Sequence, residues 1–282
     1  MVSCIHGDFS STGRTYTKGS SCSSSQPVSF ACFPCKLFYN YLSLLNRFIS
    51  YIMQMVRIIE DFFSLFYPKL CAACGAHLLQ QEELVCTQCL YNLPKTNYHR
   101  IEENPVEQVF WGRAKIAAAT AYFFFEKDTR FAKIIHQLKY RGMKEIGIEM
   151  GRIFGAELKE TSRFNEVDLI IPVPLHWKKQ KKRGYNQSEL IASGIAESMG
   201  KPIVTNILYR AVETETQTRK SRYKRWKNVE NIFRVRSADK ITGKHILLVD
   251  DVITTGSTLE SCATTLLKEN NTKVSVATLA IA

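Results

Sequence analysis

The sequence lacks the features of a membrane-spanning or exported protein. A transmembrane helix needs about 20 largely uninterrupted apolar residues, and Asn40, Asn46 and Arg47 interrupt the most apolar stretch, residues 36–56. No charged region leads into a compact apolar segment near the amino terminus, which argues against a secretory signal. We therefore expect a cytoplasmic protein without a membrane span.

Two common phosphate-binding loops are also absent, and acidic residues are scarce. Neither G-x-x-x-x-G-K-[ST] nor G-x-G-x-x-G occurs, so neither a P-loop nor a dinucleotide-binding loop is indicated. Only 26 acidic residues stand against 38 basic ones, which gives a formal net charge of +12. This excess suits a phosphate-rich ligand or a nucleic acid and does not distinguish between them.

The first 54 residues differ in composition from the rest of the 282-residue chain. Nine of the first thirty residues are serine, and no hydrophobic period is present, which is typical of disorder. We expect residues 1–54 to be a disordered leader or to lie upstream of the true start, because Met53 and Met55 precede a cleaner amphipathic stretch. We expect an amphipathic helix with a cysteine-rich module in residues 55–95 and a larger domain in residues 110–282.

The larger domain alternates between strand-like and helix-like patterns. Such alternation predicts an α/β fold with a mainly parallel sheet that helices cover on both faces. The expected strands are residues 114–125, 167–173, 203–207, 245–249 and 273–281. The expected helices are residues 129–140, 143–158, 188–199 and 258–269.

The domain is organised around ILLVDDVITTGST, residues 246–258. Four apolar residues predict a buried strand, Asp250 and Asp251 follow at once, and a hydroxyl-rich turn opens a helix. Backbone N–H groups at such a turn favour an anion, so the segment predicts a phosphate cradle. The expected cradle residues are Thr254, Thr255, Gly256, Ser257 and Thr258.

The acid pair next to this cradle suggests a sugar phosphate, with hydroxyls near the phosphate. Open α/β sheets bind ligands at the carboxyl ends of their strands, and Gly256 permits close approach of the backbone. The alternative is an ordinary strand–turn–helix with solubilising acids. It is disfavoured because two adjacent aspartates at a buried strand end are costly without a partner.

Four cysteines have the spacing of a metal site. Cys71 and Cys74 form one C-x-x-C pair, and Cys86 and Cys89 form a second after eleven intervening residues. Two such pairs bring four thiolates around one tetrahedral ion. Two disulfides or a redox pair are the alternatives, but disulfides would not persist in a reducing compartment. We expect a structural zinc ribbon.

A basic segment follows the second expected strand. In residues 170–189, Pro174 rigidifies the turn, and five of the six residues 178–183 are basic. A solvated charged loop is the usual interpretation of such a run. Because this one leaves a buried strand, it is also placed to face the crevice beside Asp250.

Two more basic segments remain open to interpretation. Six of the nine residues 219–227 are basic, with Tyr223 and Trp226 between them, a pattern that also suits single-stranded nucleic acid. Residues 139–145, KYRGMKE, predict a helix end capped by Gly142. There, a plain helix cap and a ligand role are equally open.

Together these motifs resemble one family, the competence protein ComF family, in which a zinc ribbon precedes a type I phosphoribosyltransferase-like domain. The segment VDDVITTGST resembles the phosphoribosyl-pyrophosphate (PRPP) signature of these transferases, with Ser257 where many have a second glycine. The resemblance covers roughly residues 56–282. Its other marks are the cysteine pairs, L-K-Y-R-G at 138–142, P-V-P-L-H at 172–176, R-G-Y-N-Q at 183–187, Thr216, Gln217, Arg225 and Asn228.

The resemblance implies roles for the matching positions. Asp250 and Asp251 would bind the ribose hydroxyls, and residues 254–258 the 5-phosphate. Magnesium would be held mainly by PRPP itself, and residues 213–228 resemble the loop that closes over PRPP in related transferases. The backbone at Val173, Pro174 and Leu175 would lie against pyrophosphate. The implied PRPP site also includes Arg183 and Arg225.

Two functions stay open on the sequence alone. The first is an accessory factor in DNA uptake that binds PRPP, with single-stranded DNA or uptake proteins as partners. The second is an active phosphoribosyltransferase, in which the acid pair stabilises positive charge at the ribose anomeric carbon. No nucleobase pocket is recognisable, and neither the acceptor nor the oligomeric state follows from the sequence.

Overall fold

The computed structural model describes residues 44–56, 58, 59, 62, 68–127, 129–140, 142–211 and 232–282. The chain divides into two units, residues 1–62 and 63–282. In the first unit the described residues are helical, and their large apolar side chains are exposed. No helix within the described ranges is both long and apolar enough to cross a bilayer. All elements named below belong to the second unit.

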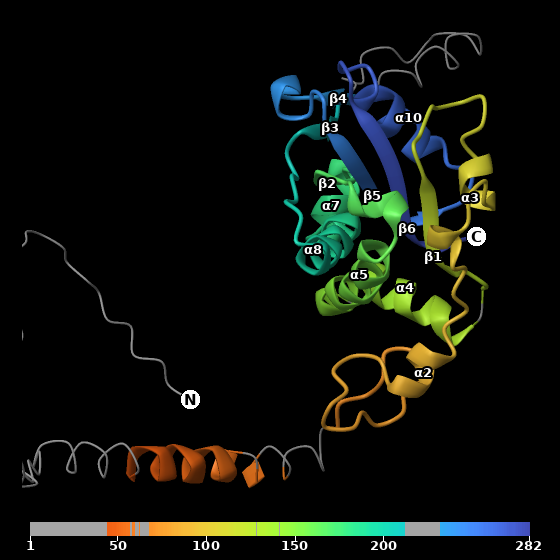
Figure 1. Cartoon of the computed structure of the whole chain (residues 1–282). Helices are drawn as coiled ribbons and strands as arrows, with labels where there is room; N and C mark the ends of the chain where they lie inside the picture. Colours follow the sequence, from red (N-terminus) through yellow and green to blue (C-terminus); the bar gives the residue numbers. More distant parts are fainter. Residues whose placement is uncertain are drawn as a thin grey trace, which may run out of the picture. The chain divides into compact units, whose positions relative to one another are not determined.

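Four parallel strands form the central sheet in the order β1–β6–β5–β2 (Figure 1). The predicted parallel sheet is therefore confirmed. The expected strand 203–207 supplies only an isolated parallel bridge between Ile203 and Ile170. The sheet strands are β1 (Ala119–Phe124), β2 (Leu169–Pro172), β5 (His245–Ile253) and β6 (Lys273–Ile281).

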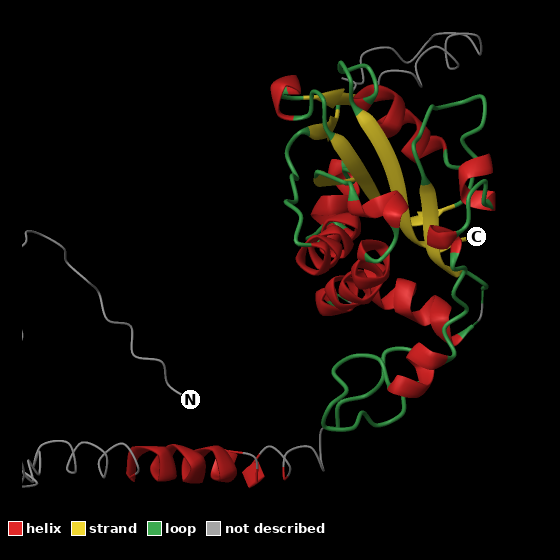
Figure 2. Cartoon of the chain, viewed as in Figure 1, coloured by secondary structure: helices red, strands yellow, loops and turns green. Residues whose placement is uncertain are grey.

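Helices cover both faces of this sheet (Figure 2). Leu247 and Val249 of β5 pack into the cluster with α5 and α8, whereas Ile246 and Leu248 pack into the cluster with α10. This alternation follows from the two-residue period of a strand. Full burial of such a side chain contributes about 1.5–3 kcal/mol. The helices are α4 (Arg130–Tyr140), α5 (Lys144–Lys159), α8 (Gln187–Met199), α10 (Ser257–Leu266) and α3 (Pro105–Gln108).

Glycines allow α5 and α8 to approach closely. A Cβ atom on Gly155 of α5 would lie 2.8 Å from the Cα atom of Ile195 in α8, and Gly151 and Gly194 face each other's helix in the same way. The close contact fixes α8 over the sheet, and with it the residues at the amino end of α8.

Several short elements were not expected. Strands β3 (Leu208–Arg210) and β4 (Phe233–Val235) pair in a two-stranded antiparallel sheet. The basic run is a helix, α7 (Trp177–Arg183), rather than a loop. The Nδ1 atom of His176 caps its first turn by accepting from the Lys178 N–H at 3.2 Å, and Gly184 ends it with φ 79°. The other short helices are α2 (Thr87–Tyr91), η1 (Tyr98–Arg100), α6 (Ser162–Asn165) and η2 (Ala238–Lys240).

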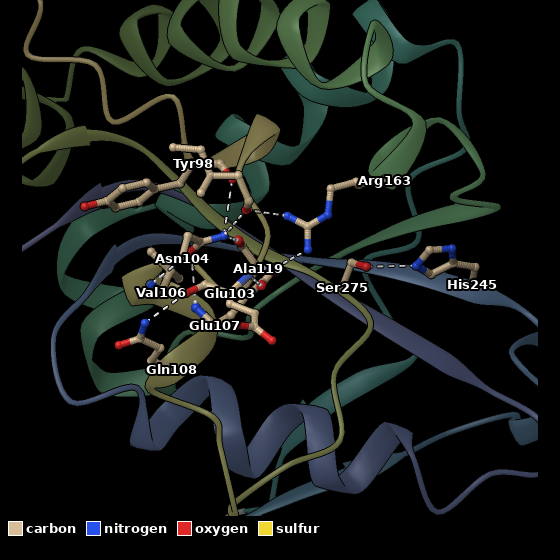
Figure 3. A network of polar contacts seen from close by, with 11 residues as sticks. Tyr98, Glu103, Asn104, Val106, Glu107, Gln108, Ala119, Arg163, His245 and Ser275 are labelled. Carbon is tan, nitrogen blue, oxygen red and sulfur yellow. Dashed lines mark hydrogen bonds and ion pairs between the residues drawn. The ribbon is translucent and has the colours of Figure 1, made fainter.

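Residues 94–109, which precede β1 in the chain, pack against it through hydrogen bonds. Glu107 is buried, and its Oε1 atom accepts from the Ala119 N–H and from Arg163 (Figure 3). The amide of Asn104 donates to the carbonyl oxygens of Tyr98, Ile101 and Ala119. These polar residues are inside because their hydrogen bonds are satisfied there.

Candidate functional site

The acid pair lies within strand β5, beyond the end of its neighbour β2. The sequence predicted a strand that stops at Val249, but β5 continues to Ile253 and stays paired with β6, with Asp250 opposite Thr278. On the other side, β2 makes its last pairing between Pro172 and Val249. The aspartates thus lie on a strand that is paired with β6 on one side and no longer paired with β2 on the other.

Asp250 is partly buried and accepts two hydrogen bonds on one oxygen. Its Oδ1 atom accepts from the Ser188 hydroxyl at 2.7 Å and from the Asp251 N–H at 2.8 Å. Burial, followed by the neighbouring charge of Asp251, raises the pKa of Asp250 to about 7. The two hydrogen bonds and the ammonium of Lys139 act in the opposite direction.

Asp251 forms an ion pair with a lysine from another helix. The Nζ atom of Lys139, near the end of α4, lies 3.0 Å from Asp251 Oδ2, and the two side chains are 22% and 15% exposed. The structure therefore assigns the K-Y-R-G segment a contact with the acid pair. The sequence alone is equally compatible with a plain helix cap in this segment.

The turn after β5 presents its hydroxyls to solvent. Thr254, Thr255, Ser257 and Thr258 are exposed, and the hydroxyls of Thr255 and Ser257 lie 3.1 Å apart. Helix α10 begins at Ser257 without a side-chain cap, so its first N–H groups are directed at the turn. This is the arrangement that favours an anion.

Gly256 has two structural reasons to be glycine. Its φ is 70°, in the left-handed region, and a Cβ atom there would lie 2.5 Å from Val109 Cγ1. Arg113 secures the same turn, since its guanidinium donates to the Thr255 carbonyl at 2.9 Å and pairs with Glu260. No sequence motif marked Arg113, which lies in an otherwise unremarkable segment.

The R-G-Y-N-Q-S segment ties three elements together. Tyr185 donates its hydroxyl hydrogen bond to the Leu138 carbonyl at 2.6 Å, and the Asn186 amide donates to the Val173 carbonyl at 2.9 Å. Asn186 also caps α8 through the Ser188 N–H. Ser188 then reaches Asp250, a role that sequence reasoning missed although the residue directly follows the quoted motif.

Arg183 is held by its own segment. Its guanidinium donates to Gln187 Oε1 at 2.7 Å and packs over the ring of Tyr140 at 5.3 Å from the ring centroid. The remaining predicted residue of this group, Arg225, lies outside the described residues, as does all of 212–231.

The loop expected to meet pyrophosphate borders a separate hollow. Val173 is buried, whereas Pro174 and Leu175 line a cavity of about 860 Å³ between this loop and the β3–β4 sheet. His176, Tyr209 and Arg236 are also in its wall. Neither aspartate nor the hydroxyl turn lines this cavity.

The four predicted cysteine ligands form one cluster. The Sγ atoms of Cys71, Cys74, Cys86 and Cys89 lie within 4.8 Å of one another, and all but Cys74 are buried. Backbone N–H groups point at the sulfurs, including that of Cys86 toward Cys71 Sγ at 3.3 Å. Although burial opposes it, such donors lower the pKa of the Cys71 thiol to about 6. Four clustered sulfur donors with N–H support fit a tetrahedral, thiolate-bound metal ion.

Known proteins are similar to this chain in sequence. A family model described as "Phosphoribosyl transferase domain" matches residues 181–281. DNA utilization protein YhgH of Escherichia coli K12 is 29% identical over 214 residues, which cover 73% of this chain and 88% of that protein. Competence protein F of Haemophilus influenzae is 33% identical over 139 residues, 48% of this chain and 61% of that protein. Competence protein ComFC of Bacillus subtilis is 30% identical over 101 residues, 36% of this chain and 39% of that protein.

Solved structures give more distant matches. The glutamine PRPP amidotransferase of B. subtilis is 23% identical with a TM-score of 0.34, over 47% of this chain and 26% of that chain. The chain thus spans about a quarter of that protein's length. Adenine phosphoribosyltransferase of Saccharomyces cerevisiae is 16% identical with a TM-score of 0.31, over 54% of this chain and 74% of that chain.

Proposed function

Since this chain belongs to the ComF family of phosphoribosyltransferase-like proteins, we propose that it binds PRPP with magnesium and acts as an accessory factor in DNA uptake or utilisation. The names of its relatives, a DNA utilization protein and competence proteins, support the cellular role. The net charge of +12 suits both the sugar phosphate and single-stranded DNA.

The observation that carries the proposal is the acid pair beside the hydroxyl turn. Carboxylates of Asp250 and Asp251 accept hydrogen bonds from a sugar diol, and the exposed hydroxyls and N–H groups of residues 254–258 receive the phosphate. Both groups lie at the carboxyl end of β5, where open parallel sheets hold their ligands. A ligand with a phosphate and a neighbouring diol can contact both the acid pair and the hydroxyl turn.

Magnesium is held mainly by the ligand in this proposal. Lys139 already pairs with Asp251, and Ser188 with Asp250, so the two carboxylates are partly satisfied by protein groups. Magnesium keeps several of its waters and is coordinated mainly by phosphate oxygens. When bound, it neutralises the pyrophosphate charge, while the chain's own residues orient the ribose.

The cysteine cluster is proposed as a structural zinc ribbon in a cytoplasmic protein. The four sulfurs are free thiols gathered in one place, and cysteine supplies every ligand, so no position is left for a catalytic water. A reducing compartment keeps such thiols available for metal.

The alternative function is an active phosphoribosyltransferase, and one observation favours it. A family model described as "Phosphoribosyl transferase domain" matches residues 181–281, which include the acid pair and the turn. In that case the acid pair stabilises positive charge that develops at the anomeric carbon as pyrophosphate leaves.

Calorimetric titration with PRPP and magnesium tests the proposal, and pyrophosphate release with a panel of acceptors separates the two functions. Binding without release on any acceptor supports the accessory role, whereas release identifies an enzyme. Binding of single-stranded DNA should weaken steeply as salt rises, because phosphate contacts release counterions. No PRPP binding would contradict both functions.

A further inference from the structure

The last turn of helix α4 connects three separate parts of the protein through three successive residues. The Gln137 amide donates to the carbonyl oxygen of Ala72, inside the cysteine module, at 2.9 Å. The carbonyl of Leu138 accepts from the Tyr185 hydroxyl, and Lys139 pairs with Asp251. Leu138 itself is fully buried. The position of Lys139 is therefore set by the contacts of the two residues that precede it.

We propose that Lys139 is a binding residue of the acid-pair site and that the cysteine module holds it in position through α4. The proposal rests on the proposed sugar-phosphate function. It adds a binding residue, Lys139, and a link to the cysteine module, neither of which that function requires. It is carried by the chain of contacts from Ala72 through Gln137 to Lys139 and Asp251.

Charge explains why a lysine is useful there. Two adjacent carboxylates repel a phosphorylated sugar, which is itself an anion. The ammonium of Lys139, 3.0 Å from Asp251 Oδ2, cancels one of these charges and leaves the other carboxylate oxygens to accept hydroxyl hydrogen bonds. The end of a helix also favours a cation, because of its macrodipole. Loss of Lys139 should therefore weaken ligands with more phosphate groups by more.

The pH dependence of binding gives a readout that a purely structural role would not change. Lys139 holds the pKa of Asp250 down, so its removal should raise the pH at which ligand binding is half-maximal. Among the residues that the structure describes, groups from several packed elements act on Asp250. These are Asp251 of β5, Ser188 of α8, Lys139 of α4 and Cys262 of α10, with Arg210 of β3 near Cys262.

The first experiment compares three variants by calorimetric titration over a pH series, with PRPP and with ribose 5-phosphate in magnesium. Lys139→Gln should weaken PRPP binding about tenfold, the order expected for one partly buried charge pair. It should weaken ribose 5-phosphate binding less. Lys139→Arg should recover most of the affinity because it keeps the charge. Lys133→Gln is the matched control, since Lys133 is an exposed cation on the same helix.

The second experiment tests the link to the cysteine module without any sugar phosphate. Gln137→Leu removes the donor to Ala72 and keeps the side chain's bulk. Hydrogen–deuterium exchange of the ligand-free, full-length protein should then become faster in the last turn of α4 and unchanged in β6. Removal of metal by a chelator should produce the same local change.

The outcomes separate this inference from the function on which it rests. A native protein that binds no sugar phosphate contradicts the proposed function, while the exchange data still report on the coupling. PRPP binding by Lys139→Gln as tight as the native protein's, or no recovery by Lys139→Arg, overturns the role of Lys139. Unchanged exchange in α4 after Gln137→Leu overturns the coupling.

Discussion

Replacement of Asp250 by asparagine should make the ligand-free protein more stable at pH 8. In the folded protein, burial and the charge of Asp251 raise the pKa of this carboxyl from 3.8 to about 7. Asparagine has nearly the same shape, and its Oδ1 atom can still accept from the Ser188 hydroxyl and the Asp251 N–H. The substitution therefore removes a costly charge and keeps the hydrogen bonds.

Proton linkage gives the sign and size of the effect. Because the folded pKa is raised, the stability contributed by Asp250 is complete below about pH 4 and is lost as the pH rises through about 7. The difference of about three units between the unfolded and folded pKa values corresponds to about 4 kcal/mol, at about 1.4 kcal/mol per unit. Since the carboxyl is partly exposed to water, we expect about half of this, roughly 2 kcal/mol.

Urea unfolding at pH 5 and pH 8, followed by circular dichroism with the metal content held constant, measures this difference. The advantage of Asp250→Asn over the native protein should be below about 1 kcal/mol at pH 5 and grow to about 2 kcal/mol at pH 8. Asp239→Asn is the control because Asp239 is exposed on η2. An advantage that does not grow with pH would refute the assignment of a buried, destabilising charge to Asp250.

Three more predictions concern the other parts of the site. Asp251→Ala should weaken PRPP binding by about ten- to a hundredfold, since a hydrogen bond to an ionised acceptor contributes about 1.5–3 kcal/mol; calorimetry that finds tight binding after loss of both aspartates would make the turn a structural relic. Metal analysis should find one zinc per chain, and Cys86→Ser should abolish it while the sheet keeps its unfolding transition; native protein without stoichiometric zinc would contradict this. Gly256→Ala should destabilise the protein by about 2–4 kcal/mol, from left-handed strain together with the clash against Val109. Gly200→Ala, which has similar φ but open space, should cost only about 1–2 kcal/mol in the same urea assay.

The regular elements followed from the sequence because their signals are local. The bounds of β6, residues 273–281, agree with the expected strand, and α4, α5 and α8 agree to within a residue or two. Strand β5 is longer than predicted. Asp250 and Asp251 break the apolar run without breaking the hydrogen-bond ladder to β6.

The contacts that complete the candidate site depend on tertiary structure. Nothing local to Lys139 or Ser188 indicates that each would reach one of the aspartates. The two-stranded β3–β4 sheet was not predicted because each strand has only three residues, too few for a periodic signal. Helix α7 buries none of its residues, so it has no apolar face to reveal it. Its ends, His176 and Gly184, were the available signals.

Mutations at the two ends of strand β5 should have opposite effects on the amount of folded protein in a cell. At the amino end, His245 bonds Ser275, near the Glu107–Arg163 network, and a change there should reduce the amount of folded protein. At the carboxyl end, Asp250→Asn should increase that amount while it impairs ligand binding. Protein abundance would therefore misreport activity for this chain: a variant that accumulates well can be the one that has lost its ligand.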